Sequence, residues 1–201
     1  MAEPTPAGAD GAPLHANSDA RHPQALERAS RVRLMIFDVD GVLTDGRLLA
    51  GPEGEVIKAF DTLDGHGIKL LAQSGITPAI ITGRRSGIVA WRMRELGIAH
   101  VYQGVQDKRT AFADVLAKTG VTADACGYMG DDWPDLPVLL QVGFAACPAQ
   151  AHREVRARCH YVAQAEGGRG AAREVCDLLL RAHGAYDALL NDILAGGAAP
   201  T

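Results

Sequence analysis

Short apolar runs alternate with stretches of helical spacing along most of this chain. The runs that predict buried strands lie at residues 33–37, 79–81, 101–103, 127–129 and 144–146. Helical spacing falls between them, in stretches such as 67–73, 88–96 and 111–118. Because parallel strands need a crossover between them, this alternation favours an α/β fold. We expect a Rossmann-like, doubly wound parallel sheet with helices on both faces.

Residues 47–60 interrupt the alternation. They predict two short strands around a Gly-Pro-Glu-Gly turn, which is a β-hairpin projecting from the sheet. An isolated hairpin is marginal in water, and this one carries Leu48, Leu49, Val56, Ile57 and Phe60. We therefore expect it to pack against another surface, such as a second subunit.

The ends of the chain differ in composition from its middle. Residues 1–27 are rich in Ala, Gly and Pro and almost empty of large apolar side chains, so we expect a disordered N-terminal tail. Residues 169–194 have helical spacing. With 201 residues in all, we expect one domain over residues 28–185, followed by a C-terminal helix end and tail over 186–201.

The overall charge and hydropathy exclude several classes of function. A net charge of −4 offers no basic excess, so neither nucleic acid nor an anionic membrane is the expected partner. No apolar run approaches the roughly 20 residues that span a bilayer, and no secretory signal opens the chain. We expect a cytoplasmic protein whose four cysteines are buried, reduced thiols.

Acidic residues collect where predicted strands end. Asp38 and Asp40 follow the first strand, Asp131 and Asp132 follow the fourth, and Asp135 lies one helical turn further on. Open parallel sheets bind ligands at the carboxyl ends of their strands. Carboxylates gathered there repel one another unless a cation lies among them, and hard oxygen ligands suit Mg²⁺. The sequence therefore predicts a magnesium site.

Hydroxyl and basic groups follow the other strands. Thr82 and Gly83 come after the second strand, and Lys108 begins a helix after the third. A carboxylate nucleophile, a cation, a hydroxyl and a lysine around one point meet the needs of phosphoryl transfer, in which charge on the equatorial oxygens is neutralised. Such a site forms an aspartyl phosphate and then hydrolyses it.

These segments, in this order, resemble the motifs of haloacid dehalogenase phosphatases. DVDGVLTDG at 38–46 is similar to the first motif, Thr82 to the second, Lys108 to the third, and GDDWPD at 130–135 to the fourth. The resemblance implies that Asp38 is the nucleophile and Asp40 the general acid and base. It also implies that Thr82 and Lys108 bind the phosphoryl group and that Asp132 steadies the lysine or the substrate. Magnesium would be held by Asp38, the backbone carbonyl of Asp40, and Asp131.

Many members of that superfamily carry a cap domain, but neither usual insertion point has room for one here. The chain is therefore expected to be a capless, C0-type member that needs cover from another subunit. The hairpin, DTLDGHGIKLL, ITGRRS, YQGVQDK and GGRGAAREVCDLLL narrow the resemblance to 3-deoxy-D-manno-octulosonate 8-phosphate (KDO 8-P) phosphatases. That family is homotetrameric and makes free Kdo for lipopolysaccharide. Its hairpins meet at the tetramer centre, and its glycine-arginine tail reaches a neighbouring active site.

The same resemblance implies a pocket for a small phosphorylated sugar acid. The residues carried over as substrate-binding are Asp40, Asp61, Thr62, Leu63, Asp64, Gly65, Lys69, Arg84, Arg92, Lys108, Asp132 and Arg169. The arginines and lysines suit a ligand that bears a carboxylate and a phosphate. Arg92 and Arg169 also fit plain structural readings, an exposed helical charge and a loop before a helix. Trp133 and Pro134 depart from the family pattern.

Other functions stay open at this point. A capless scaffold also serves phosphatases of sialic-acid-type sugar 9-phosphates and modules fused to cytidylyltransferases. A receiver-like, non-enzymatic phospho-aspartate module would use similar residue types, but it has no use for an acid two residues after the phosphorylated one, so Asp40 favours the enzyme. Nucleotide binding has little support, because neither GxxxxGK[ST] nor a GxGxxG after a strand is present.

Overall fold

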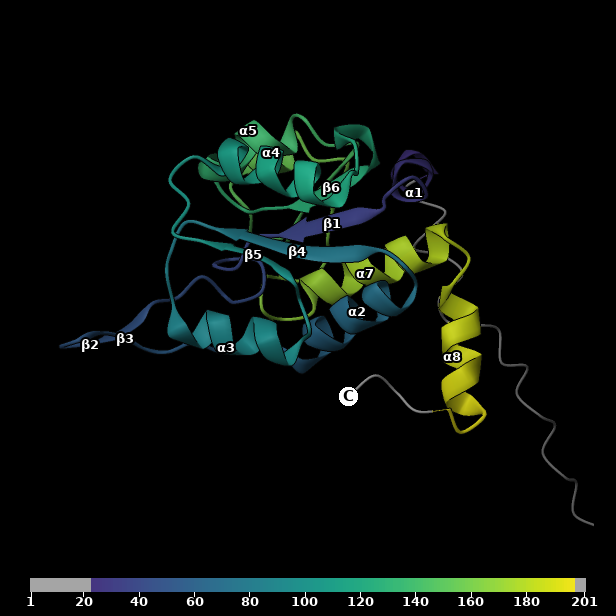
Figure 1. Cartoon of the computed structure of the whole chain (residues 1–201), viewed down its shortest axis with the longest axis horizontal. Helices are drawn as coiled ribbons and strands as arrows, with labels where there is room; N and C mark the ends of the chain where they lie inside the picture. The colour runs from purple at the N-terminus through teal and green to yellow at the C-terminus, as the bar shows by residue number, and fades with distance from the viewer. Residues whose placement is uncertain (1–22, 198–201) are drawn as a thin grey trace, which may run out of the picture.

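A six-stranded parallel sheet forms the centre of the computed structural model, which describes residues 23–197. The strands lie in the order β5-β4-β1-β6-β7-β8. Their bounds are β1 Leu34–Phe37, β4 Thr77–Thr82, β5 His100–Gln103, β6 Cys126–Met129, β7 Phe144–Cys147 and β8 Tyr161–Val162. This is the Rossmann order, so the predicted fold class is confirmed (Figure 1). The sequence prediction missed β8, because a strand of two residues leaves no readable pattern.

Helices cover both faces of the sheet (Figure 1). The helices on one face are α2 Thr62–Gln73, α3 Gly87–Glu95 and α7 Ala171–Ala182, and those on the other are α4 Lys108–Thr119, α5 Leu136–Leu139 and α6 Arg153–Arg156. Alternation along β1 feeds both cores, since Met35 and Phe37 pack with α2 and α7, whereas Leu34 and Ile36 pack with α4 and α5. Both sides of the central strand are thus anchored before the chain reaches Asp38.

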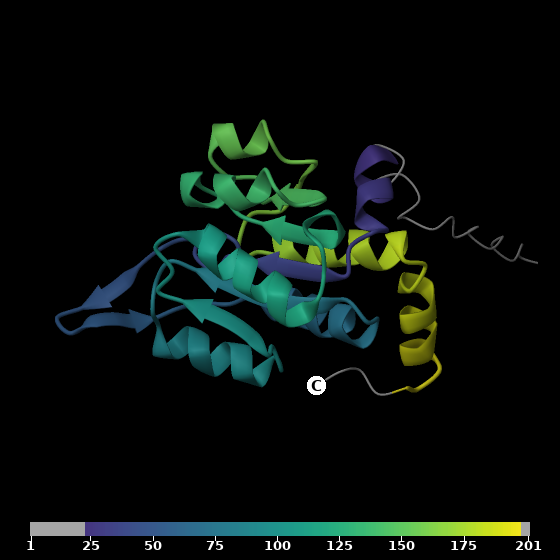
Figure 2. The same ribbon diagram turned by 45° about the horizontal axis from the view of Figure 1, so that its top comes forward.

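The hairpin projects away from this body as a separate two-stranded sheet, with β2 at Leu49–Gly51 and β3 at Gly54–Ile57 (Figure 2). Leu48, Leu49, Val56 and Ile57 are each about half exposed in the single chain. Phe60, where the chain returns, packs against the core. The predicted hairpin is therefore present, and there is no room for a cap domain between β1 and β4.

Two boundaries predicted from the sequence are wrong. Residues 23–27 belong to helix α1 (Pro23–Ala29), which buries Ala25 and Ala29 against the core. Two small residues and the partly buried Leu26 supply that contact, so the segment folds with a single large apolar side chain. The rest of the predicted tail lies outside the described residues. The C-terminal stretch forms two helices, because Gly184, with φ +67°, ends α7 and a second helix, α8, spans Tyr186–Leu194.

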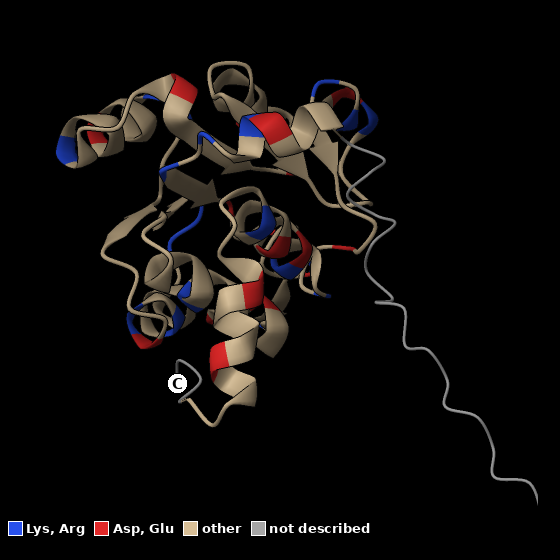
Figure 3. Cartoon of the chain, turned by 90° about the vertical axis from the view of Figure 1, so that its right-hand side faces the viewer, with Lys and Arg blue, Asp and Glu red and all other residues tan. Residues whose placement is uncertain are grey.

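Within residues 23–197, no helix is both long and apolar enough to cross a membrane. All four cysteines are free thiols, of which Cys159 alone is only half-buried. Figure 3 shows acidic and basic positions interspersed along the elements on one side of the molecule.

Candidate active site

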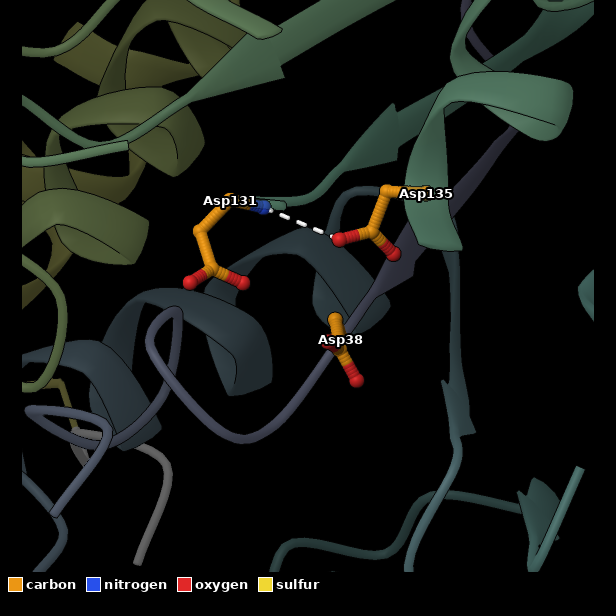
Figure 4. Close-up of side chains that lie close together, drawn as sticks. All are labelled: Asp38, Asp131 and Asp135. Carbon is orange, nitrogen blue, oxygen red and sulfur yellow. Dashed lines mark hydrogen bonds between the residues drawn. The ribbon is translucent and has the colours of Figure 1, made fainter. Parts of the chain in front are cut away.

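The acids of the first and fourth motifs meet where β1 and β6 end. The two strands are neighbours in parallel register, with Phe37 opposite Met129, and the backbone N–H of Asp38 donates to Met129 O at 3.0 Å. This is the switch point of the sheet, because the chain leaves β1 toward one edge and returns at β6 to build the other. Asp38, Asp131 and Asp135 each offer a ligand oxygen there, and these oxygens lie within 4.8 Å of one another (Figure 4).

Lys108 places its ammonium inside this acidic cluster. Asp107 caps the helix that Lys108 begins, by accepting from the N–H of Arg109. The Lys108 Nζ lies 3.0 Å from Asp38 Oδ2 and 2.6 Å from Asp135 Oδ1, and the side chain is 4% exposed. A buried ammonium needs such partners, and these two carboxylates supply them.

Asp135 organises the loop after β6. Its Oδ1 accepts from Lys108 Nζ and from the Tyr128 hydroxyl, both at 2.6 Å. Its Oδ2 accepts from the N–H of Asp131 at 3.0 Å (Figure 4). The same oxygen accepts from the N–H of Asp132 at 3.2 Å. Both oxygens are therefore fully engaged with protein donors.

The acidic cluster carries excess negative charge, and one of its carboxylate oxygens has no hydrogen-bond partner in the described part of the chain. Burial and then the charge of Asp135 raise the pKa of Asp38 to about 6, although Lys108 opposes the rise. Burial and the charges of Asp135 and Asp38 raise the pKa of Asp131 to about 8. Among buried side-chain polar atoms of residues 23–197, only Asp38 Oδ1 lacks a hydrogen-bond partner. An oxygen-lined site with excess negative charge and an unpaired carboxylate oxygen fits a hard divalent cation.

Glycines let the segments around this cluster approach closely. Gly41 adopts φ +86°, and a Cβ there would overlap the Asp131 carboxylate. A Cβ on Gly167 would overlap the backbone oxygen of Gly41. Gln150 bridges the two loops, because its Nε2 donates to Gly41 O at 2.7 Å while its Oε1 accepts from the N–H of Gly167 at 2.9 Å. The loop after β1 is thus held by the glycine-rich segment of its own chain.

Asp40 lies in a second group of charges. Its carboxylate accepts a hydrogen bond from Lys58 Nζ and lies 3.7 Å from Arg84 Nε. The Lys58 side chain is 1% exposed, whereas that of Arg84 is 59% exposed. Burial alone would lower the pKa of Lys58, but its bonds to Asp40 and Glu55 outweigh burial and raise that pKa, so the group is a cation.

Some of the remaining predicted residues are buried or line a pocket, and others are exposed. Thr82 ends β4 and is buried, and Arg84 borders a pocket of about 380 Å³ that Glu55 and Arg85 also line. Thr62 and Leu63 are exposed at the start of α2, and Asp132 and Arg169 are exposed in loops.

Other members of the predicted pocket make internal contacts. Asp61 caps α2 by accepting from the N–H of Leu63. Asp64 is buried and accepts from the N–H of Arg173 at 2.8 Å; burial raises its pKa to about 6. Arg92 lies over the Phe60 ring and pairs with Glu95 at 2.6 Å.

Gly65 and Lys69 are the remaining predicted pocket residues on α2. A Cβ on Gly65 would overlap the guanidinium of Arg92, so α2 and α3 pack through this glycine. Lys69 is half-buried about two turns into α2. The structure thus gives Arg92 and Gly65 a packing contact in the single chain.

The sequence does not reveal the partners that hold Lys108 and Asp40. The notable cases are Asp135 and Tyr128 around Lys108, and Lys58 beside Asp40. The resemblance implies that Asp132 steadies the lysine or the substrate, and in the described residues the carboxylate of that loop that contacts Lys108 is Asp135. The apolar run 127–129 hid Tyr128 as a core aromatic, and an isolated lysine in a hairpin gives no signal of a buried ion pair.

Carboxylates gathered at the switch point of a capless parallel sheet, with a buried lysine among them, define a phosphatase of the haloacid dehalogenase superfamily. A TM-score of 0.83 relates the chain to a haloacid dehalogenase superfamily hydrolase from Legionella pneumophila, at 39% identity over 89% of this chain and 98% of that one. None of the protein-family models compared with the chain matches it.

Closer relatives identify the family. The 3-deoxy-D-manno-octulosonate 8-phosphate phosphatase of Salmonella typhimurium is 47% identical over 165 residues, which is 82% of this chain and 88% of the relative. The crystal structure of the Moraxella catarrhalis phosphatase of that name, in complex with a magnesium ion, a phosphate ion and KDO, has a TM-score of 0.82 and 41% identity over 85% of this chain and 98% of its own. The chain belongs to the 3-deoxy-D-manno-octulosonate 8-phosphate phosphatase family.

Proposed function

We propose that the chain is a magnesium-dependent phosphatase that hydrolyses 3-deoxy-D-manno-octulosonate 8-phosphate to Kdo and phosphate, a step toward lipopolysaccharide. The similarity to relatives of that activity supports the substrate. The observation that carries the chemistry is Asp38, a buried carboxylate with one oxygen on Lys108 and the other unpaired among further acids.

Magnesium would be held by the side chains of Asp38 and Asp131 and by the backbone carbonyl of Asp40. Asp135 lies in the same cluster, but both of its oxygens already accept from protein donors, so its proposed role is to hold the loop and the lysine. When bound, the ion neutralises the phosphate oxygens and lets the substrate dianion approach the acids.

In the proposed mechanism, a carboxylate oxygen of Asp38 attacks phosphorus while the bond from phosphorus to the sugar oxygen breaks. Asp40 gives its proton to that leaving oxygen. The same carboxylate then accepts a proton from water, which attacks phosphorus and releases phosphate from Asp38. Lys108 and Thr82 neutralise and orient the phosphoryl oxygens throughout.

Substrate recognition is proposed on the side of Asp40 that faces the hairpin. Arg84 extends there from the loop after β4, beside the pocket it shares with Glu55 and Arg85. Its guanidinium suits the sugar carboxylate. The other predicted contacts are Asp61, Thr62, Leu63, Asp64, Gly65, Lys69, Arg92, Asp132 and Arg169. Asp64, Arg92 and Gly65 meet internal partners in the single chain, so their role would be to shape the pocket.

Phosphate release from a panel of sugar phosphates tests the function. We expect fast turnover of the eight-carbon acid 8-phosphate, slow turnover of the nine-carbon 9-phosphate, and loss of both with a chelator. Equal or faster turnover of the nine-carbon ester would reassign the substrate. No release from any ester with magnesium present would end the enzymatic proposal.

We also propose that the protein acts in the cytoplasm as a homotetramer joined through its hairpins, with the glycine-arginine segment near a neighbouring site. The exposed apolar hairpin residues support this assembly. Light scattering after size exclusion measures the mass, and Val56→Glu is expected to reduce it. A wild-type monomer at working concentration contradicts the assembly, and cell fractionation tests the location.

A further inference from the structure

Lys58 is the residue of the hairpin that reaches the reaction site. It follows β3 directly, and it is almost completely buried although the strand before it is exposed. Its Nζ donates to Asp40 Oδ1 and lies 2.9 Å from Glu55 Oε1. A lysine carried by an exposed hairpin yet buried against an aspartate has lost most of its hydration, which is costly unless the pairing is maintained.

The chain of contacts continues beyond Lys58. The other carboxylate oxygen of Glu55 accepts a hydrogen bond from the Ser86 hydroxyl. Ser86 is the N-cap of α3 and also donates its N–H to Gln103 at 2.8 Å. A line of polar contacts therefore runs from Asp40 through Lys58 and Glu55 to the loop after β4.

Arg84 offers Asp40 a weaker alternative anchor. Its Nε lies 3.7 Å from Asp40 Oδ2, beyond normal hydrogen-bond distance, and its side chain is mostly exposed. Among ion pairs of the described residues, Lys58 is thus the close partner of this carboxylate. Because it holds Oδ1 alone, the second oxygen stays available.

We propose that Lys58 is a positioning residue, which fixes the Asp40 carboxylate so that its second oxygen faces the leaving oxygen of the substrate. The inference rests on the proposed role of Asp40 as general acid. Lys58 touches neither phosphorus nor the leaving group and acts through Asp40. A lysine that served only to fasten the hairpin would affect all substrates alike.

Two classes of ester separate these roles. A sugar or alkyl phosphate has a poor leaving group that must be protonated, whereas p-nitrophenyl phosphate releases a stable phenolate that needs little help. General acid catalysis contributes about 10²–10⁴-fold where it is needed. We expect Lys58→Met to lower kcat/KM, which covers the steps up to departure of the leaving group, by about 100-fold on the sugar ester and by only about 3-fold on p-nitrophenyl phosphate. Lys58→Arg, which keeps the cation, restores part of the loss on the sugar ester.

Ser86→Ala is the matched control, since it cuts the same line of contacts at its outer end. It should lower kcat/KM for the sugar ester and for p-nitrophenyl phosphate by the same factor. If Lys58→Met is poorly folded by circular dichroism, Lys58→Gln gives the same comparison with a smaller volume change. A common factor for both esters in the Lys58 variants, or no effect on either, overturns the inference.

Asp40→Asn separates a failure of this inference from a failure of the mechanism. If Asp40 is the general acid, this variant discriminates between the esters, and adding Lys58→Met to it lowers the sugar-ester rate no further. Discrimination by Asp40→Asn without discrimination by Lys58→Met sinks the positioning role alone. An equal fold loss of kcat/KM on both esters in Asp40→Asn refutes the assignment of the acid itself.

Discussion

Replacing Lys108 by methionine removes the cation from the centre of the acidic cluster. In the folded chain this ammonium lies 3.0 Å from Asp38 Oδ2, 2.6 Å from Asp135 Oδ1 and 3.3 Å from the Tyr128 hydroxyl. Removing one partner of a buried ion pair costs about 3–5 kcal/mol, because the remaining charges lose compensation without regaining water. We expect a loss of that size in the free energy of unfolding, measured without metal at pH 8, and no measurable turnover.

The pH dependence of this loss identifies its cause. Asp38 and Asp131 have pKa values of about 6 and 8, both above the ordinary 3.8, so the metal-free folded state loses stability as pH rises through those values. Without Lys108 the carboxylates repel more strongly, and the loss becomes steeper. Urea unfolding from pH 5 to pH 8.5 should show the smallest difference between wild type and variant at pH 5.

Magnesium should partly restore the variant, since binding to the folded state alone adds about 2.7 kcal/mol at a concentration 100 times Kd. Lys118→Met is the control. It also breaks a lysine–aspartate pair, with Asp114, but the side chain is 58% exposed, so we expect almost no change in the free energy of unfolding at any pH. If the loss of unfolding free energy in Lys108→Met changes with neither pH nor magnesium, lost packing rather than lost charge causes it.

Three further substitutions test the parts around the cluster. Gly167→Ala should lower the free energy of unfolding by about 3 kcal/mol and also reduce kcat, because the added Cβ overlaps the backbone oxygen of Gly41. A Cβ at Gly87 meets open space, so Gly87→Ala is the control and should be neutral or slightly stabilising in the same unfolding assay. Asp64 has a pKa of about 6 against an ordinary 3.8, so wild type should lose up to about 3 kcal/mol relative to Asp64→Asn as pH rises from 4 to 7 in urea titrations, and a constant difference would contradict the raised pKa. Tyr128→Phe removes a hydroxyl that donates at 2.6 Å and should cost about 1–2 kcal/mol by thermal unfolding; no cost would mean that the bond contributes nothing.

The positions of Asp38, Asp131, Thr82 and Lys108 could be read from the sequence because topology alone brings them together. Each lies at the end of a parallel strand or in the segment after it, and the carboxyl ends of parallel strands share one edge of the sheet. The hairpin could be predicted from its turn residues. Strand β8 and helix α1 could not, because two residues are too few for a period and because α1 packs through the small Ala25 and Ala29 with a single large side chain, Leu26.

The contacts of Lys108, Asp40 and Asp64 depend on side-chain direction, which the spacing of residues along the sequence does not determine. GDDWPD contains several acids, and only the folded loop decides that Asp135, rather than Asp132, turns inward to Lys108. Lys58 looks like a solvated charge on an exposed strand until the chain bends back toward Asp40. Asp64 lies in a segment that the family resemblance predicts to bind substrate, but its carboxylate accepts from the N–H of Arg173.

The glycine-rich segment 167–170, which precedes α7, also holds the loop that follows Asp38. Gly168, with φ +64°, donates its N–H to Val42 O at 2.9 Å, and the neighbouring Gly167 is joined through Gln150 to Gly41. A displacement on the order of 1 Å can cost about 100-fold in rate, so contacts that hold this loop from behind would keep Asp38, the proposed nucleophile, at its working distance. Any movement of the glycine-rich segment on substrate binding would therefore reach the loop that carries Asp38 through the Gly168 backbone and the Gln150 side chain.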